Sequence, residues 1–209
     1  MRITGGTGKG RTLKVPAGSR IRPTADKVKQ ALFNILGDKV QDALFLDLYC
    51  GTGGVGIEAI SRGAERAFFV DDARQSLQVT RQNIEQCGFE ARATIVPAKA
   101  GSFLKKAPRE FDIVFLDPPY SLDQDQLLTM VAESEILKQN SVIVSEHFKK
   151  QKSPERAGRL SLYREAVYGD TVLAFYKIGL AAPGGEGGNS DVSSYPGHAG
   201  NSLQRKEIV

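Results

Sequence analysis

Short apolar runs alternate with helical patterns between residues 44 and 145, and this alternation restricts the fold more than any other feature. The apolar runs predict strands at 44–48, 67–70, 93–96, 111–116 and 141–145. Helical spacing of apolar residues predicts helices at 55–62, 74–87, 101–106 and 126–137. Strands that alternate with helices are typical of an α/β fold whose parallel sheet is covered on both faces.

The flanking segments complete this domain plan. The first fourteen residues, punctuated by glycine, predict a small basic β-hairpin within an N-terminal extension at 1–20. A helix capped by Thr24 follows near the start of the main domain, which we place at 21–180. Two apolar runs, 160–168 and 171–178, flank a Gly-Asp turn and predict a closing antiparallel hairpin. The glycine-rich segment 181–209 predicts a disordered tail.

Positive charge is concentrated at the N-terminus. Residues 1–30 hold eight lysines and arginines and one aspartate, although the whole chain carries a net charge of only +4. This pattern favours an arm that binds a polyanion, with a solvated, flexible terminus as the alternative. The candidate phosphate contacts are Arg2, Lys9, Arg11 and Lys14.

Cysteine, histidine and apolar content exclude several classes of protein. Two cysteines and two histidines predict neither a disulfide framework nor a metal site. No apolar run reaches the ~18 residues that a membrane helix needs. We therefore expect a cytoplasmic monomer with no metal and no membrane partner.

A glycine-rich loop follows the first predicted strand. Gly51-Thr52-Gly53-Gly54-Val55-Gly56 fits the pattern G-x-G-x-x-G between a strand and a helix. Asp71 follows about 20 residues later, at the end of the next predicted strand, where an acid commonly binds a ribose diol. The pattern predicts a nucleotide-containing cofactor, and the alternative is a turn that only packs strand against helix.

Asp47 decides which cofactor this loop suits. It stands at the end of the first predicted strand, four residues before Gly51. A carboxylate there would repel the pyrophosphate of a dinucleotide. S-adenosylmethionine has no phosphate and carries an ammonium and a sulfonium, which a nearby carboxylate stabilises. The alternative for Asp47 is an acid that caps a helix or braces the loop.

Asp117-Pro118-Pro119-Tyr120 follows the fourth predicted strand, at the sheet edge where open α/β folds bind ligands. The lone pair of an exocyclic amine is delocalised into its base, so the amine is a poor nucleophile. A carboxylate and a carbonyl that accept its N–H bonds favour a nitrogen that can attack a methyl group. The prolines stiffen the turn and remove two donors. Tyr120 offers a face on which a base removed from its helix can stack. A rigid surface turn is the alternative.

These motifs together resemble the class I S-adenosylmethionine-dependent methyltransferases that modify amino nitrogens. More narrowly, the chain is similar to the bacterial 16S rRNA guanine-N2 methyltransferases named for nucleotide 966. The narrower resemblance covers about residues 2–178. It rests on the segment from Gly5 to Arg11, on 22–28 (RPTADKV) running on to 33–36 (FNIL), and on 47–53 (DLYCGTG) with 117–120 (DPPY).

The resemblance implies a Rossmann-like fold with a seven-stranded, mostly parallel sheet. It also implies a cofactor, S-adenosylmethionine, and a macromolecular partner, which is 16S rRNA or a small ribosomal subunit assembly particle. Carried over to matching positions, it implies that Asp47, Gly51 and Gly53 line the methionine part, Asp71 binds the ribose and Ala100 borders the adenine. Arg22 and Thr24 would close the cofactor site, and Asp117, Pro118 and Tyr120 would hold the guanine.

Three other interpretations remain open from the sequence. One is an amino-methyltransferase that acts on adenine or cytosine in DNA, or on adenine in RNA, with the same loop; the chain has no obvious target-recognition domain for sequence-specific DNA. Another is a nicotinamide-dependent oxidoreductase, which leaves Asp47 and the Pro-Pro turn unexplained. The last is a non-catalytic RNA-binding module that uses the basic arm, against which the intact Asp47 and Asp117 argue.

Overall fold

A computed structural model describes residues 1–15, 24–107, 110–119, 122–179 and 207–208. Five helices and two 3₁₀ turns are present in these ranges: α1 (Thr24–Leu36), η1 (Gly37–Val40), α2 (Gly54–Ser61), α3 (Arg74–Cys87), η2 (Glu90–Arg92), α4 (Ala100–Leu104) and α5 (Gln124–Glu133). The strands are β1 (Leu44–Leu48), β2 (Arg66–Asp71), β3 (Ala93–Pro97), β4 (Phe111–Leu116), β5 (Leu137–Phe148), β6 (Arg156–Ala157), β7 (Leu160–Tyr168), β8 (Thr171–Ile178) and β9 (Glu207–Ile208).

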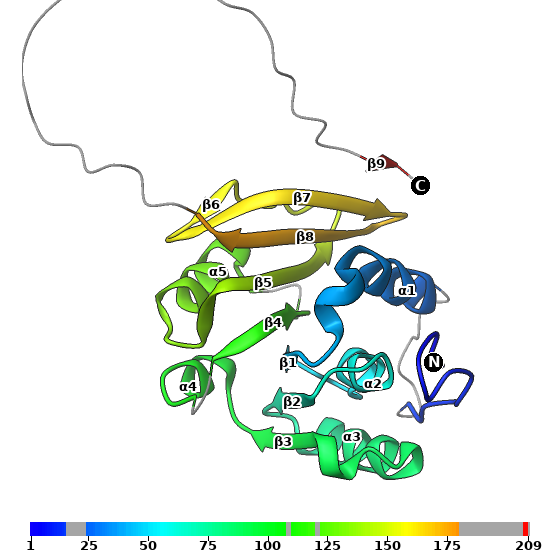
Figure 1. Cartoon of the computed structure of the whole chain (residues 1–209). Helices are drawn as coiled ribbons and strands as arrows, with labels where there is room; N and C mark the ends of the chain where they lie inside the picture. Colours follow the sequence, from blue (N-terminus) through cyan, green and yellow to red (C-terminus); the bar gives the residue numbers. More distant parts are fainter. Residues whose placement is uncertain (16–23, 108–109, 120–121, 180–206, 209) are drawn as a thin grey trace, which may run out of the picture.

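All strands belong to one sheet with the order β3-β2-β1-β4-β5-β8-β7-β6 (Figure 1). The pairs from β3 to β5 are parallel, whereas β5, β8 and β7 pair antiparallel. The predicted α/β fold, with seven strands and a closing hairpin, is confirmed. Two strands of two residues each, β6 and β9, were not predicted, and both pair with β7. Apart from β9, the tail expected at 181–209 lies outside the described residues.

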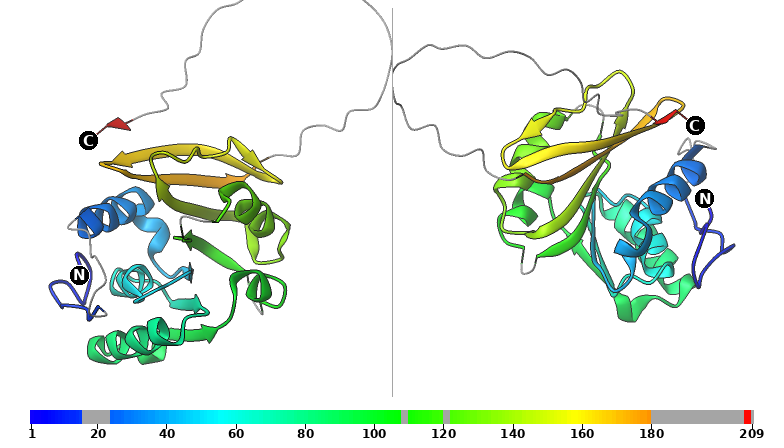
Figure 2. Two further views of the ribbon diagram at one scale, coloured as in Figure 1. Left: turned by 180° about the vertical axis from the view of Figure 1, so that it is seen from behind. Right: turned by 45° about the horizontal axis from the view of Figure 1, so that its top comes forward.

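Helices cover both faces of the sheet (Figures 1 and 2), because side chains alternate between the two faces of each strand. On one face α1, α2 and α3 bury Phe45 and Phe115 in one apolar core. On the other face α4 and α5 bury Leu46 and Leu116 in a second core. Both faces of the parallel strands β1, β2 and β4 are therefore buried, which explains their nearly continuous apolar sequence.

The strand order places a switch point between β1 and β4. From β1 the sheet continues to β2 and β3 on one side and to β4 and β5 on the other. In open α/β sheets a ligand binds in the crevice beyond the carboxyl ends of the two strands at such a point. The segments that follow β1 and β4 are the glycine loop and the Asp117-Pro118 turn.

The boundary between α5 and β5 differs from the prediction. The helix expected at 126–137 ends at Glu133, and Ser134 is extended, with φ −79° and ψ 160°. β5 begins at Leu137, which pairs with Phe111 of β4. Ile136 and Leu137 are buried in the second core. Leu137 belongs to β5 and Ile136 directly precedes it, although the sequence predicted both within the helix. Tertiary packing overrides local propensity at this position.

The N-terminal segment folds back on itself as predicted, although only one β-bridge forms, between Arg2 and Thr12. It packs closely on α2 and α3: Ile3 and Leu13 are each 2% exposed within the first core. The backbone amide of Thr7 donates to the carbonyl of Ser61, and that of Lys14 donates to Asn83 Oδ1. Residues 1–14 are therefore part of the folded domain, and the alternative of a solvated, flexible terminus is wrong for them.

In the described part of the chain, no helix has the length and apolar character to span a membrane.

Candidate active site

A cleft of about 280 Å³ opens at the switch point. Its lining comes from β1, the glycine loop, β4, β5, α1 and the N-terminal residue. The lining residues are Met1, Lys29, Leu32, Asp47, Tyr49, Cys50, Gly51, Thr52, Gly54, Val55, Phe115, Asp117 and Glu146. The cleft therefore brings together Asp47, Gly51 and Asp117, which the sequence predicted from two separate motifs.

The glycine loop adopts a conformation that only glycine takes easily. Gly51 and Gly53 have φ of 54° and 77°. At Gly53 a Cβ would also lie 2.8 Å from Thr80 Cγ2, so this position excludes a side chain for two reasons. Asp71 Oδ2 accepts the backbone N–H of Gly51 at 2.9 Å, and its Oδ1 accepts that of Ala73 at 2.8 Å. Asp71 thus braces the loop and stands beside the cleft.

Asp47 is a buried carboxylic acid in the wall of the cleft. Its carboxyl is 2% exposed, and its Oδ2 accepts the N–H of Gly56 at 2.8 Å, inside the first turn of α2. The pKa of Asp47 is raised from 3.8 to about 7. Burial is the largest cause, the Gly56 hydrogen bond opposes the rise, and repulsion from Asp117 and Asp71 adds to it. Asp47 therefore makes the contact with the first turn of α2 that the alternative interpretation expects, and its role in cofactor binding stays a prediction. The three neighbouring carboxylates also create a field that favours a cation.

The remaining predicted residues fall in different places. Asp117 is exposed at the cleft and Pro118 behind it is buried. Ala100 begins α4 and is not among the residues that line the cleft. Thr24 begins α1, as predicted. Arg22 and Tyr120 lie outside the described residues.

Ten of the thirteen cleft residues were not predicted as site residues, and Met1, Lys29, Tyr49 and Glu146 are among them. Glu146 could have been predicted from the sequence, because it directly follows the predicted fifth strand, at the sheet edge that holds Asp47 and Asp117. Tyr49 has φ 68°, a strained value for a non-glycine residue, and such strain is often found at functional sites. Burial raises the pKa of the Cys50 thiol, which makes Cys50 unsuited to act as a nucleophile.

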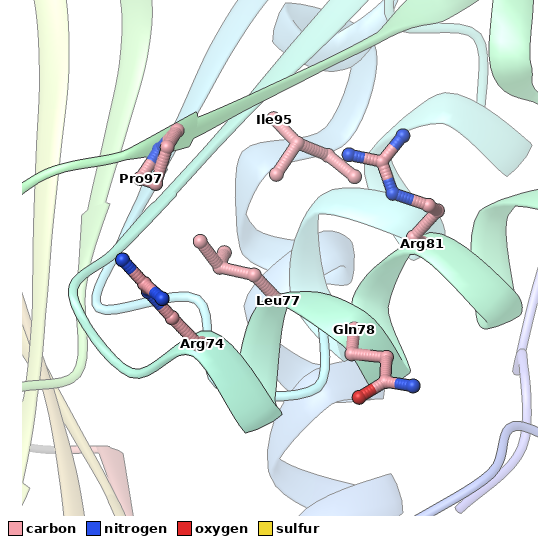
Figure 3. A pocket seen from close by; sticks show the side chains of 6 residues that line it. All are labelled: Arg74, Leu77, Gln78, Arg81, Ile95 and Pro97. Carbon is pink, nitrogen blue, oxygen red and sulfur yellow. The ribbon is translucent and has the colours of Figure 1, made fainter.

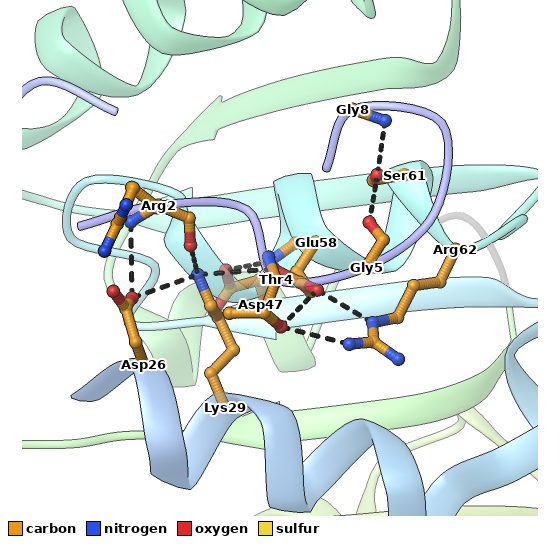
Figure 4. Close-up of polar contacts among 11 residues, drawn as sticks. Arg2, Thr4, Gly5, Gly8, Asp26, Lys29, Asp47, Glu58, Ser61 and Arg62 are labelled. Carbon is orange, nitrogen blue, oxygen red and sulfur yellow. Dashed lines mark hydrogen bonds and ion pairs between the residues drawn. The ribbon is translucent and has the colours of Figure 1, made fainter. Parts of the chain in front are cut away.

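Lys29 belongs to a buried ionic cluster behind the cleft (Figure 4). Its Nζ lies 3.3 Å from Glu58 Oε2 and donates to the carbonyl of Arg2. Glu58 is fully buried and also accepts from Arg62 Nε at 2.7 Å and from Thr4. Lys29 is only 3% exposed, and these contacts fasten the N-terminal segment to α1 and α2.

The four predicted phosphate contacts are exposed, and two of them also have structural partners. Arg11 Nη1 donates to the carbonyl of Cys87 at the end of α3. Lys14 Nζ lies 3.4 Å from Gln82 Oε1. The exposed Lys9 stands in the turn of the segment, and Arg2 lies next to the ionic cluster. The segment thus presents basic side chains from a fixed backbone.

A second groove lies between α3 and β3, away from the cleft (Figure 3). Arg74, Leu77, Gln78, Arg81, Ile95 and Pro97 line it. Because it contains none of the predicted site residues, it is not the candidate active site. Within the described ranges, no group of three or more His, Cys, Asp and Glu side chains could hold a metal ion.

Comparison with known proteins identifies relatives that span nearly the whole chain. A Bacillus subtilis protein, YlbH, is 39% identical over 85% of this chain and 98% of that protein. The ribosomal RNA small subunit methyltransferase D of Escherichia coli is 32% identical over 85% of this chain and 89% of that protein. The solved structure of the Escherichia coli protein yhhF superposes with a TM-score of 0.76 at 32% identity, covering 86% of this chain and 98% of that one.

The model of the family described as "Conserved hypothetical protein 95" matches residues 1–177. This match covers the N-terminal segment, the glycine loop, the Asp117 turn and the closing hairpin, and it stops where the glycine-rich tail begins. The chain therefore belongs to this family, together with the small-subunit ribosomal RNA methyltransferases D, and it is a methyltransferase with a Rossmann-like fold.

Proposed function

We propose that the protein methylates the exocyclic N2 amine of a guanine in 16S rRNA, at nucleotide 966, with S-adenosylmethionine as the methyl donor. The substrate is the RNA itself or an assembling small subunit, and the protein acts as a monomer. The observation that carries the proposal is the cleft at the switch point, which places Asp117 beside Asp47 and the glycine loop. Relatives named ribosomal RNA small subunit methyltransferase D support the RNA substrate.

The carboxylates of the cleft suit S-adenosylmethionine better than a dinucleotide. Burial and two carboxylate neighbours already oppose ionisation of Asp47. A pyrophosphate would add to this repulsion, whereas an ammonium or a sulfonium relieves it. Asp47 and the backbone at Gly51 and Gly53 would then hold the methionine part, and Asp71 would bind the ribose. S-adenosylmethionine supplies an activated methyl group on a sulfonium.

The remaining cofactor contacts follow from the family resemblance. Ala100, at the start of α4, would border the adenine, at the carboxyl end of β3. Arg22 and Thr24 would close the methionine end from the N-terminal side. Thr24 begins α1, the helix that contributes Lys29 and Leu32 to the cleft wall.

Asp117 would orient the amine that reacts. Its carboxylate accepts an N–H of the amine and the carbonyl of Pro118 accepts the other, which turns the nitrogen lone pair out of the base plane. Asp117 is exposed, so the proton released after methyl transfer can pass from its carboxylate to water. Tyr120 would stack on the base that has been removed from its helix.

The Asp117 variants test this role. We expect Asp117→Ala to lower the methyl-transfer rate by a factor on the order of 10²–10³. Binding of S-adenosylmethionine, measured by calorimetry, should stay within a few-fold, because Asp117 acts on the amine. Asp38→Ala is the matched control, since Asp38 is exposed in η1, before the amino end of β1. Near-wild-type turnover of the Asp117 variant would refute the assignment, and tighter binding of NAD than of S-adenosylmethionine would favour the oxidoreductase alternative.

A further inference from the structure

Glu146 stands next to Asp117 at the carboxyl edge of the sheet. β4 and β5 pair in parallel with Leu116 opposite Ser145, so the next residues, Asp117 and Glu146, are neighbours on adjacent strands. Adjacent strands lie about 4.8 Å apart. Both residues line the cleft, one from the end of β4 and the other from within β5. Two carboxylates therefore stand side by side where the substrate base is expected.

The side chain of Glu146 shares its face of the sheet with the cleft. Side chains alternate along a strand, and Val144 of β5 is buried in the first core together with Phe115 of β4. Glu146 continues the Val144 face. It is half-buried, and it pairs across the strands with Leu173 of β8, which is fully buried. Partial removal from water makes its hydrogen bonds more selective, because an unmatched polar group is costly to bury there.

We propose that Glu146 is a specificity-determining residue that recognises the ring N1–H of the target guanine while Asp117 holds the N2 amine. This inference rests on the proposed function. In guanine the reacting amine stands beside N1–H, which is a donor. In adenine and cytosine the ring nitrogen beside the amine is an acceptor with a lone pair. An ionised carboxylate is only an acceptor, so it binds the first arrangement and repels the second.

The existing contacts of the two carboxylates are compatible with this role. Asp117 and Glu146 each interact with other groups of the protein. A carboxylate has about four lone-pair sites, which is more than a single hydrogen bond uses. Side chains that start on neighbouring strands can converge on the adjacent donors of the Watson–Crick edge of guanine, which a base removed from its helix exposes.

The test compares guanine with 2-aminopurine at the target nucleotide of 16S rRNA assembled into small subunits. 2-Aminopurine keeps the exocyclic amine but has a lone pair at N1 in place of N1–H. We expect the wild type to prefer guanine by on the order of 10²–10³ in kcat/KM, since sites that hydrogen-bond a group reject analogues without it. Glu146→Gln should reduce this preference at least about tenfold, because its amide can donate to N1.

Two further variants keep the test falsifiable. Glu146→Asp retains the carboxylate, so it should retain the preference for guanine at a lower rate. Glu165→Gln is the matched control, because Glu165 is also half-buried, on β7, outside the cleft. In a second readout, 2-aminopurine fluorescence with S-adenosylhomocysteine present should show tighter binding of the 2-aminopurine RNA to Glu146→Gln than to the wild type.

The outcomes separate the two proposals. If the wild type methylates guanine and its preference over 2-aminopurine is unchanged in Glu146→Gln, the role of Glu146 is refuted and the proposed function stands. If Glu146→Gln does not fold, loss of the preference in a folded Glu146→Asp refutes the role instead. If the wild type methylates neither base, the proposed function itself fails.

Discussion

At the residue scale, Asp47 braces the first turn of α2 and also has a raised pKa. It accepts the Gly56 N–H inside α2, and burial next to Asp117 and Asp71 raises its pKa to about 7. A cation bound in the cleft favours the ionised form of Asp47 and thereby couples ligand binding to release of a proton. The same coupling makes the affinity of the protein for a cationic cofactor depend on pH.

We predict that affinity for S-adenosylmethionine rises as the pH rises from 5.5 toward 7, approaching tenfold per pH unit at the acid end. Asp47→Asn keeps an oxygen that can accept the Gly56 N–H but removes the charge. The variant should bind more weakly and without this pH dependence. Calorimetry at pH 6.5, in buffers that differ in ionisation enthalpy, should detect proton release from the wild type only. Equal pH slopes for the two proteins would contradict this account.

The free energy of unfolding should depend on pH in the opposite direction to the cofactor affinity. The folded state keeps the Asp47 proton up to about pH 7, whereas the unfolded chain releases it near 3.8. Folding therefore binds the extra proton between about pH 4 and 7, and this residue's contribution to stability falls as the pH rises through that window. Asp47→Asn should be more stable than the wild type at pH 8 in urea unfolding, with a smaller difference at pH 5. No gain at pH 8 would indicate that the folded carboxylate has a favourable partner.

At the element scale, the N-terminal segment is a rigid platform, because the Glu58 cluster and Asn83 hold its backbone against α2 and α3. Replacing Glu58 or Lys29 alone would break a buried ion pair, a change that typically costs about 3–5 kcal/mol. Variants of the segment should therefore be confined to exposed side chains. Arg11 is also unsuitable, since its guanidinium donates to the carbonyl of Cys87.

Lys9 and Lys14 are the exposed positions that test RNA binding by this platform. Removing one lysine that neutralises a phosphate should reduce the log–log salt dependence of RNA affinity by roughly one unit. We therefore expect the double variant Lys9→Gln, Lys14→Gln to reduce the slope by about 2 units, with unchanged affinity for the cofactor. The matched control replaces the exposed Lys39 and Lys106, which lie before the amino ends of β1 and β4. If the double variant and the control have the same slope, RNA is bound elsewhere.

Local sequence predicted the elements that carry the chemistry, because their signals are short-range. The glycine loop follows its strand directly, and Asp117 follows β4 in the same way. The burial of Lys29 could not be predicted, since it depends on Glu58, 29 residues along the chain, and on the carbonyl of Arg2. The end of α5 was also missed, because Ile136 and Leu137 are apolar at a spacing that suits a helix as well as a strand.

At the scale of the whole molecule, the switch point between β1 and β4 gathers the two motifs into one cleft. The sequence predicted both motifs at the carboxyl edge, but their neighbours Met1, Lys29 and Glu146 come from the N-terminal segment, α1 and β5. These residues meet at the cleft only because the folded chain brings their segments together at the switch point.

The product of the reaction tests the central claim most directly. Small subunits from a strain that lacks the corresponding gene would be incubated with the protein and S-adenosylmethionine, and the 16S rRNA digested to nucleosides for mass spectrometry. The account predicts one new methyl group as N2-methylguanosine, mapped to nucleotide 966, in an amount that approaches one per subunit. A methyl group on an adenine or a cytosine, or no transfer to naked 16S rRNA or to particles, would contradict it.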